Sequence, residues 1–239
     1  MRGEQIDKKV ISSEILYIIA ITSLSFAVNI MEQANFGMSM IVSPAFILSK
    51  SVSFLTYGQA EYIVAGLIFI LFCIIMKQFK ISYLSSFITG VLYATMADIW
   101  QAILPVYPVE SQYGFFIRII YFCIGLILSA LAIAMFYKTY FYPQIYDFFV
   151  KQVAMKYNIS LQKFKTGFDC VFLIFSVIFS LLVFHKLVGV GIGTVIMAIC
   201  NGTLISYFKN QLDKHFVCVS KLNKLANYLE NEGGIQDGV

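Results

Sequence analysis

Charged side chains are scarce in this sequence. Asp, Glu, Lys and Arg make up 13% of its 239 residues, while hydrophobic residues make up 59%. Soluble domains contain about 25% charged and roughly 45–50% apolar residues. Because a soluble fold of this size needs polar groups over its whole outer surface, the shortage of charge excludes an ordinary soluble protein. The composition predicts an integral membrane protein.

The residues that build catalytic and metal sites are also few or scattered. The two histidines, His185 and His215, have no second ligand at metal-binding spacing. The five cysteines form neither a disulfide framework nor a metal knuckle. The sequence has no G-x-S-x-G elbow and no pair of carboxylates on one predicted helix face. We therefore expect a protein that is not an enzyme and uses neither a metal nor a cofactor.

Long apolar runs are what the sequence has in abundance. A bilayer core about 30 Å thick needs about 20 apolar residues of helix. Six stretches reach or nearly reach this length, namely 15–33, 59–76, 81–104, 118–137, 168–184 and 187–208. The first follows a basic start like that of a secretory signal, but it is long, lacks a clear cleavage site and precedes more hydrophobic spans. We interpret it as an uncleaved helix and predict an all-α fold with six transmembrane helices.

Lys and Arg are unevenly distributed among the predicted loops. They gather before the first span, between the second and third, between the fourth and fifth, and after the last. The loop 105–117 contains none, and the other two loops on its side contain one Lys each. Because Lys and Arg mark cytoplasmic loops, we expect a multi-pass protein of the inner (cytoplasmic) membrane with both termini in the cytoplasm. Cations spread along one rim do not form a nucleic-acid-binding patch.

The two halves of the chain resemble one another weakly at an offset of about 104 residues. The second span of each half then begins near Gly58 and Gln162, and Asp98 falls opposite Asn201. Each half holds three spans, an odd number, so the second half must enter the membrane from the opposite face. Inverted repeats of this kind build many secondary transporters. The predicted organisation is a cytoplasmic N-terminus (1–14), a first repeat (15–104), an external loop (105–117), a second repeat (118–208) and a cytoplasmic tail (209–239).

Short segments follow the first and fourth spans and are expected to form re-entrant or interfacial helices. Segment 40–54 is apolar, but Pro44, Lys50 and several serines make a full crossing costly, so it crosses, re-enters or lies on the membrane. Segment 144–157 carries Asp147, Lys151 and Lys156 and is expected at the inner surface with its aromatic face toward the bundle. In the tail, apolar residues recur at helical spacing from 219 to 229. They predict an amphipathic helix that lies on the inner membrane surface or packs on the cytoplasmic loops.

The run Lys186-Leu187-Val188-Gly189-Val190-Gly191-Ile192-Gly193-Thr194 resembles the K-x-V-G-V-x-x-G-T run of YczE/YyaS/YitT-type bacterial integral membrane proteins. Phe168-Asp169, Gly90 with Asp98, and segment 33–39 are similar to the F-D, G-x(7)-D and K-A-N-x-G-x-S patterns of that family. Gln33 departs from it where a Lys is usual, and the proline expected after Ser39 appears only at Pro44. The resemblance covers about 24–208 and implies a six-helix membrane fold. That family has no settled biochemical activity, so it implies no substrate.

Polar side chains within the predicted spans are the candidate site residues, because an ionisable group at the bilayer centre costs about 2.5–3.5 kcal/mol on insertion scales. Asp98 lies deepest and is either a proton, cation or polar-substrate site or a packing partner of Asn201. Asp169 either takes part in binding or pairs with Lys165 near the start of its helix. The other candidates are Asn29 and Gln101, together with Asn35, Gly37 and Ser39 in the polar break after the first span, which is pocket lining or plain loop punctuation.

These features predict a secondary transporter that moves a small solute by alternating access. Its expected partners are the lipid bilayer, the solute and a proton or cation, and homo-oligomerisation stays open. The alternative is a non-transporting accessory or assembly protein that acts through helix–helix contacts. In a transporter, Asp98, Asn29, Gln101 and Asn201 are expected to converge on one aqueous cavity. A scaffold would satisfy these groups in pairs and leave no cavity.

Overall fold

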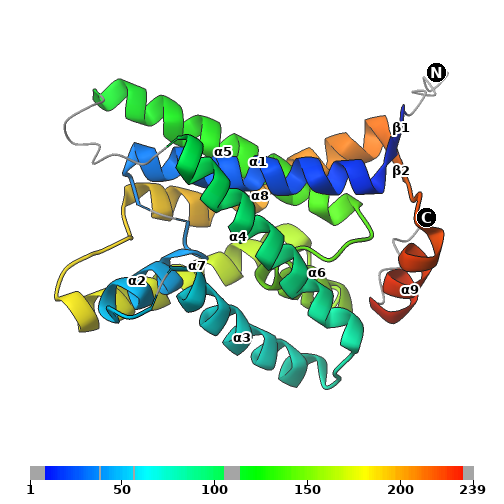
Figure 1. Ribbon diagram of the computed structural model, residues 1–239, viewed down its shortest axis with the longest axis horizontal. Helices are drawn as coiled ribbons and strands as arrows, with labels where there is room; N and C mark the ends of the chain where they lie inside the picture. The colour runs from blue at the N-terminus through cyan, green and yellow to red at the C-terminus, as the bar shows by residue number, and fades with distance from the viewer. Residues whose placement is uncertain (1–8, 38, 56, 105–113, 234–239) are drawn as a thin grey trace.

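The computed structural model describes residues 9–37, 39–55, 57–104 and 114–233, apart from the side chains of Tyr57, Asp98 and Glu232 (Figure 1). Five helices of this part of the chain are long and apolar enough to cross a membrane. They are α1 (Ser13–Ala34), α3 (Tyr57–Met76), α5 (Phe115–Lys138), α7 (Leu161–Phe184) and α8 (Ile192–His215). The first four cover predicted spans, and α8 begins five residues after the start of the predicted span 187–208. The helices indicate a membrane-embedded, mainly α-helical protein.

The predicted third span is split in two. A single 3-10 turn, η1 (Ile81–Leu84), is followed by α4 (Ser85–Ile103). α4 is not among the five most apolar helices, because serines, threonines, Asp98 and Gln101 lower its hydropathy. In Figure 1, α4 runs obliquely across the view, with α1, α5 and α8 above and α3 and α7 below.

The two short helices expected after the first and fourth spans are present as α2 (Ser43–Ser51) and α6 (Ile145–Lys156). The expectation for α6 was wrong in one respect. All residues from Ile145 to Ala154 are buried, including Asp147, Lys151 and Gln152. α6 therefore lies inside the bundle instead of presenting a polar face to the inner surface. Asp147 tolerates this position because it pairs with Lys165 on α7, and Lys151 because it donates to the Tyr137 carbonyl oxygen and lies over the Tyr137 ring.

Helix contacts follow a regular scheme. α1 packs along α5, α1 also packs against α4, and α5 also packs against α8. α2 contacts both α3 and α7, and so does α6, while α7 packs against α8. Around α6 the core is aromatic: Phe148 lies 5.1 Å from Phe72 and 5.4 Å from Tyr83 between ring centroids.

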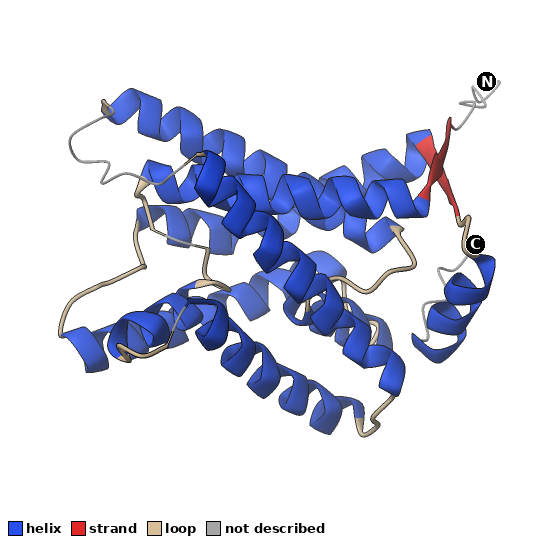
Figure 2. Cartoon of the chain, in the orientation of Figure 1, coloured by secondary structure: helices blue, strands red, loops and turns tan. Residues whose placement is uncertain are grey.

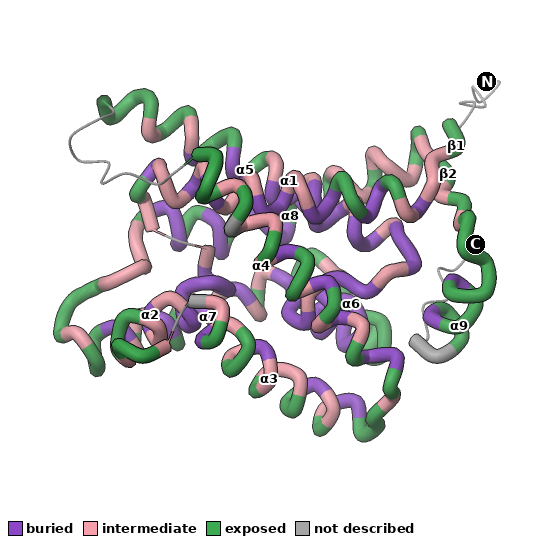
Figure 3. Tube along the Cα trace, viewed as in Figure 1, coloured by how far each residue is buried: buried purple, intermediate pink, exposed green. Residues whose placement is uncertain are grey.

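The outer faces of the long helices are apolar and exposed (Figure 3). Phe116 on α5 is 79% exposed, Leu182 on α7 is 73% exposed and Leu67 on α3 is 62% exposed. Exposed apolar faces of this extent on long helices fit a lipid environment and would aggregate in water.

One feature was not predicted. Strand β1 (Lys9–Ser12) pairs in parallel with β2 (Phe216–Val219), which joins the two ends of the described chain (Figure 2). Glu14 strengthens this junction, since its Oε1 accepts hydrogen bonds from the backbone N–H groups of Lys221 (2.8 Å) and Leu222 (3.0 Å). The Tyr140 hydroxyl donates to the same oxygen at 3.0 Å. Burial and this hydrogen bond raise the pKa of Tyr140 to about 12, so its hydroxyl keeps its proton at physiological pH.

The tail differs in detail from its prediction. α8 continues to His215, well beyond 208, and the amphipathic helix α9 spans Asn223–Gly233. Its buried residues are Ala226 and Leu229, whereas Leu225 is exposed. α9 packs against η1, which favours the expected alternative of a helix packed on the loops.

Candidate functional site

The polar break after α1 meets the glycine-rich entry to α8. α1 ends at Asn35 in the left-handed conformation, and Gly37 has a φ of +100°. The N–H of Gly193 donates to the Phe36 carbonyl oxygen at 2.8 Å. A Cβ on Gly191 or Gly193 would overlap Phe36, so these glycines allow the close backbone approach. Residues 187–191 are non-helical, which confirms the extended entry expected for this run.

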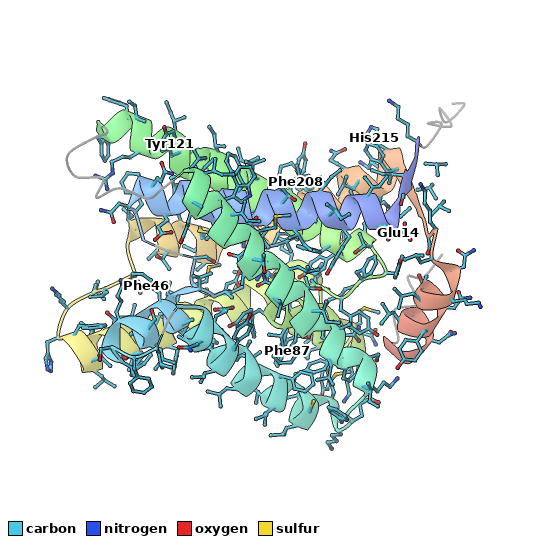
Figure 4. All side chains as sticks on the ribbon, viewed as in Figure 1. Glu14, Phe46, Phe87, Tyr121, Phe208 and His215 are labelled. Atoms are coloured by element: carbon cyan, nitrogen blue, oxygen red, sulfur yellow. The ribbon has the colours of Figure 1, made fainter. Side chains whose placement is uncertain are left out.

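A pocket of about 430 Å³ opens where these two segments meet. α1 contributes Met31 and Glu32, the break contributes Asn35 to Gly37, α2 contributes Phe46, and the α8 entry contributes 187–192. Figure 4 shows Phe46 at the end of the molecule opposite Glu14. The pocket therefore lies far from the strand pair, between segments that belong to different halves of the chain.

Arg118 binds the end of α1 that forms one wall of this pocket. Arg118 at the start of α5 donates to the carbonyl oxygens of Ala34 (2.8 Å) and Asn35 (3.0 Å), which caps the C-terminal end of α1. Its guanidinium also lies 4.8 Å from the centre of the Phe36 ring, a favourable cation–π distance. Among the described residues that line the pocket, Glu32 is the one with a charged side chain.

Two of the predicted site residues adjoin the pocket wall without lining it. Gln101 on α4 donates to Glu32 Oε2 at 3.4 Å. Asn29 donates to the Leu104 carbonyl oxygen at 3.4 Å and accepts a hydrogen bond from Gln33 at 3.2 Å. These contacts join α1 to α4 behind Glu32. Sequence reasoning placed Glu32 in the break but did not select it as a site residue.

Ser39, Asn201 and Asp169 lie away from the pocket lining, and the side chain of Asp98 is not among the described residues. Ser39 precedes α2, where its carbonyl oxygen accepts a hydrogen bond from the Ser43 hydroxyl at 3.0 Å. Asn201 is buried on α8, and its Oδ1 has no hydrogen-bond partner among the described residues. The side chain of Asp98 lies outside the described residues, so its pairing with Asn201 stays a prediction. The structure thus brings together Asn35 and Gly37, with Asn29 and Gln101 beside them, and keeps Asn201 and Asp169 out of the pocket lining.

Asp169 belongs to a buried ion cluster between α6 and α7. Lys165 Nζ lies 3.0 Å from Asp169 Oδ1, which confirms the predicted pair, and 3.0 Å from Asp147 Oδ1 on α6. All three side chains are at most 7% exposed. Nearby on α6, Lys151 is buried and donates to the Tyr137 carbonyl oxygen at 3.0 Å. This arrangement favours a structural role for Asp169.

A small, partly open cavity of about 20 Å³ lies between α3, α4 and the start of α6. Its described lining includes Glu61 on α3, Tyr93 on α4, and Gln144 and Tyr146 beside or on α6. Glu61 Oε2, the Gln144 amide nitrogen and the Tyr146 hydroxyl are buried without a well-aligned hydrogen-bond partner among the described residues. Sequence reasoning missed Glu61, although it is the sole carboxylate in the run 59–76.

A family model described as a family of unknown function (DUF6198) matches residues 11–210. No curated protein matches the chain. No solved structure matches it either.

Proposed function

The chain belongs to the family of unknown function DUF6198, and we propose that it is a secondary transporter that moves a small solute across a membrane by alternating access. The pocket between the break after α1 and the entry to α8 is the observation that carries this proposal. Broken helices whose backbone groups face a cavity are the usual solute sites of such transporters.

The pattern of helix contacts supports an inverted repeat of two three-span halves. Pairing α1 with α5, α2 with α6, α3 with α7 and α4 with α8 converts three of the helix contacts into other observed contacts, whereas the α7–α8 contact has no comparable α3–α4 counterpart among the described residues. The α1–α4 contact becomes α5–α8, the α2–α3 contact becomes α6–α7, and the α2–α7 contact becomes α6–α3. This symmetry agrees with the sequence offset of about 104 residues and supports six spans, with α4 as the third.

The two cavities share part of their lining under the same pairing. The pocket is built by the end of α1 and the break after it, α2 and the start of α8, whereas the smaller cavity is built by Gln144, α6, α4 and, in addition, α3. A wide site in one half and a narrower related one in the other is the kind of difference between halves that alternating access would exchange. The transport cycle would exchange the two.

The pocket favours a small solute that carries an amine or another positive group. Its volume of about 430 Å³ falls in the range of small-molecule sites, about 300–1,000 Å³. Glu32 supplies the charge of the described lining and favours a cationic group there, while Arg118 behind Phe36 and Lys50 near Glu32 partly offset that charge.

The Lys-rich loops support an inner-membrane location with both termini in the cytoplasm. The glycine run at 186–194 supports kinship with the YczE/YyaS/YitT-type proteins as a further part of the proposal.

A thermal-stability screen of the detergent-solubilised protein tests the solute class. A solute at about 100 times its Kd stabilises the folded state by about 2.7 kcal/mol. We expect small cationic or zwitterionic solutes to raise the melting temperature, Glu32→Gln to abolish the shift, and Glu230→Gln on the exposed face of α9 to leave it intact. Solutes that pass the screen are then tested for uptake into proteoliposomes. A shift that survives in Glu32→Gln would contradict the assignment of this pocket.

The second candidate function is that of a non-transporting accessory or assembly protein. The pairwise hydrogen bonds of Asn29, Gln33 and Gln101 between α1 and α4 favour it. In that case, no solute would shift the melting temperature and proteoliposomes would show no uptake.

A further inference from the structure

The small cavity beside Glu61 holds polar groups that the fold does not need for packing. The Tyr146 side chain is 1% exposed, and its hydroxyl lacks a well-aligned hydrogen bond among the described residues. The same is true of Glu61 Oε2 and of the Gln144 amide nitrogen. Glu61 and Tyr146 lie within hydrogen-bonding reach of each other, so the carboxyl, the hydroxyl and the Gln144 amide form one polar cluster around the cavity. Because buried polar groups with incomplete hydrogen bonds are costly, this cluster indicates that something small is exchanged there.

The size of the cavity limits what it can hold. Its volume of about 20 Å³ exceeds the roughly 10–15 Å³ of probe volume that one water molecule needs, but leaves no room for an organic solute. The ligand is therefore a water molecule, a proton or a small ion.

The chemistry of the lining favours a proton. The described lining includes no Lys, Arg or His to neutralise Glu61, and an ionised carboxylate without a partner is strongly disfavoured in a buried site. Tyr93, Tyr146 and Gln144 supply hydroxyl and amide hydrogens, which can hydrogen-bond to a carboxyl group. A metal cation such as sodium would need a shell of oxygen ligands instead.

Tyr93 connects this cavity to the proposed solute pocket. It lies on α4 within electrostatic reach of both Glu61 and Glu32, and Glu32 lines the pocket. Tyr146 approaches Glu61 from α6 and also lies within reach of Tyr93. The titratable groups around Glu61 are thus Tyr93 and Tyr146 from the neighbouring helices and Tyr62, which lines the same cavity from α3, with Glu32 beyond Tyr93.

We propose that Glu61 is the site that takes up and releases the coupling proton of the transporter. The carboxylate binds one proton while the cavity is narrow and returns it to water when the α3–α6 interface opens. In that step the O–H bond of the Glu61 carboxyl breaks and a water molecule takes up the proton as hydronium; where the Tyr93 hydroxyl relays it, Tyr93 accepts one proton and releases its own, so that its O–H bond is restored. The role of Glu61 in coupling rests on the proposed transport function, but its protonation can be measured without any solute.

Infrared titration of the purified protein tests the protonation directly. The spectrum of the wild type minus that of Glu61→Gln is expected to show a protonated carboxyl band at neutral pH. This band should be lost at high pH and be insensitive to sodium. The matched control Glu230→Gln removes an exposed carboxylate and should leave the band unchanged. Absence of the band, or its loss on adding sodium at constant pH, would overturn the proposal.

Carbodiimide labelling of the wild type gives a second measurement that needs no variant to fold. The reagent attacks protonated carboxyl groups in apolar surroundings, so a peptide carrying an adduct on Glu61 is expected, with a yield that falls as the pH rises. A yield independent of pH would contradict the assignment. If the band and the adduct are found but no solute is taken up, the transport function fails and the proton site stands. If uptake occurs without them, the coupling site lies elsewhere.

Discussion

Removing Lys165 should destabilise the protein more than removing either of its partners. Lys165 Nζ is 3.0 Å from both Asp147 and Asp169, and all three side chains are almost inaccessible. Lys165→Met leaves two carboxylates buried without their shared cation. Asp169→Asn, by contrast, leaves the pair of Lys165 and Asp147 intact.

The magnitude follows from the burial of the cluster. Breaking a buried ion pair by removing one partner costs about 3–5 kcal/mol, so we expect Lys165→Met to reach at least that range. A chain of 150–250 residues loses roughly 2–4 °C of melting temperature per kcal/mol, which predicts a loss of about 6–20 °C. Asp169→Asn should cost distinctly less, because one ion pair remains.

Thermal unfolding in detergent measures these differences. The matched control is Lys209→Met, because Lys209 forms an i,i+4 pair with Asp213 at 3.0 Å but both side chains are at least one-third exposed. Exposed pairs contribute about 0–1 kcal/mol. A triple variant that removes the charges of Lys165, Asp147 and Asp169 together should be more stable than Lys165→Met alone. The effects of mutations at coupled groups do not add, and this variant leaves no charge buried without a partner. A loss in Lys165→Met no larger than in Lys209→Met would refute the reasoning.

Two further predictions concern the pocket wall and the topology. Gly191→Ala should lower the free energy of unfolding by about 1–3 kcal/mol, as overpacking does, because its Cβ would overlap Phe36. The control Gly66→Ala places its Cβ in open space and should not. Thermal unfolding measures both, and equal losses of stability would contradict the close approach. A reporter enzyme fused after Leu104 should be active outside the cytoplasm, and one fused after Lys156 inside it, since Lys-rich loops stay in the cytoplasm; the reverse pattern would contradict the proposed orientation.

Hydrophobic length was enough to predict the helices and most of their bounds. The apolar runs 118–137 and 15–33 correspond to α5 and α1 with small shifts at their ends, because the bilayer imposes a minimum length on each run. The polar residues and the glycine after the first apolar run also predicted a break at Asn35 and Gly37, which the structure confirms. Local sequence carries this information directly.

The burial of α6 and the contacts between residues far apart in the sequence were harder to predict. The Lys residues of α6 suggested a surface helix, but the partner that neutralises Asp147 lies on α7, beyond the reach of local periodicity. Glu61 was overlooked, and its neighbours Tyr93 and Tyr146 come from other helices, which local periodicity does not reveal. The strands β1 and β2 have four residues each and lie at opposite ends of the sequence, so neither gave a pattern long enough to recognise.

The difference between the two halves is where coupling would arise. At the offset of about 104 residues, Glu61 on α3 is the counterpart of Lys165 on α7. Lys165 fastens α7 to α6 through Asp147, whereas Glu61 faces α6 without a cation among the described residues that line the cavity. The ion pair between Lys165 and Asp147 therefore keeps α6 and α7 together. The contact between α3 and α6 depends instead on whether the Glu61 carboxyl group is charged. A proton that neutralises Glu61 favours closure of that interface, and its loss favours opening, since an ionised carboxylate gains water only when the cavity opens.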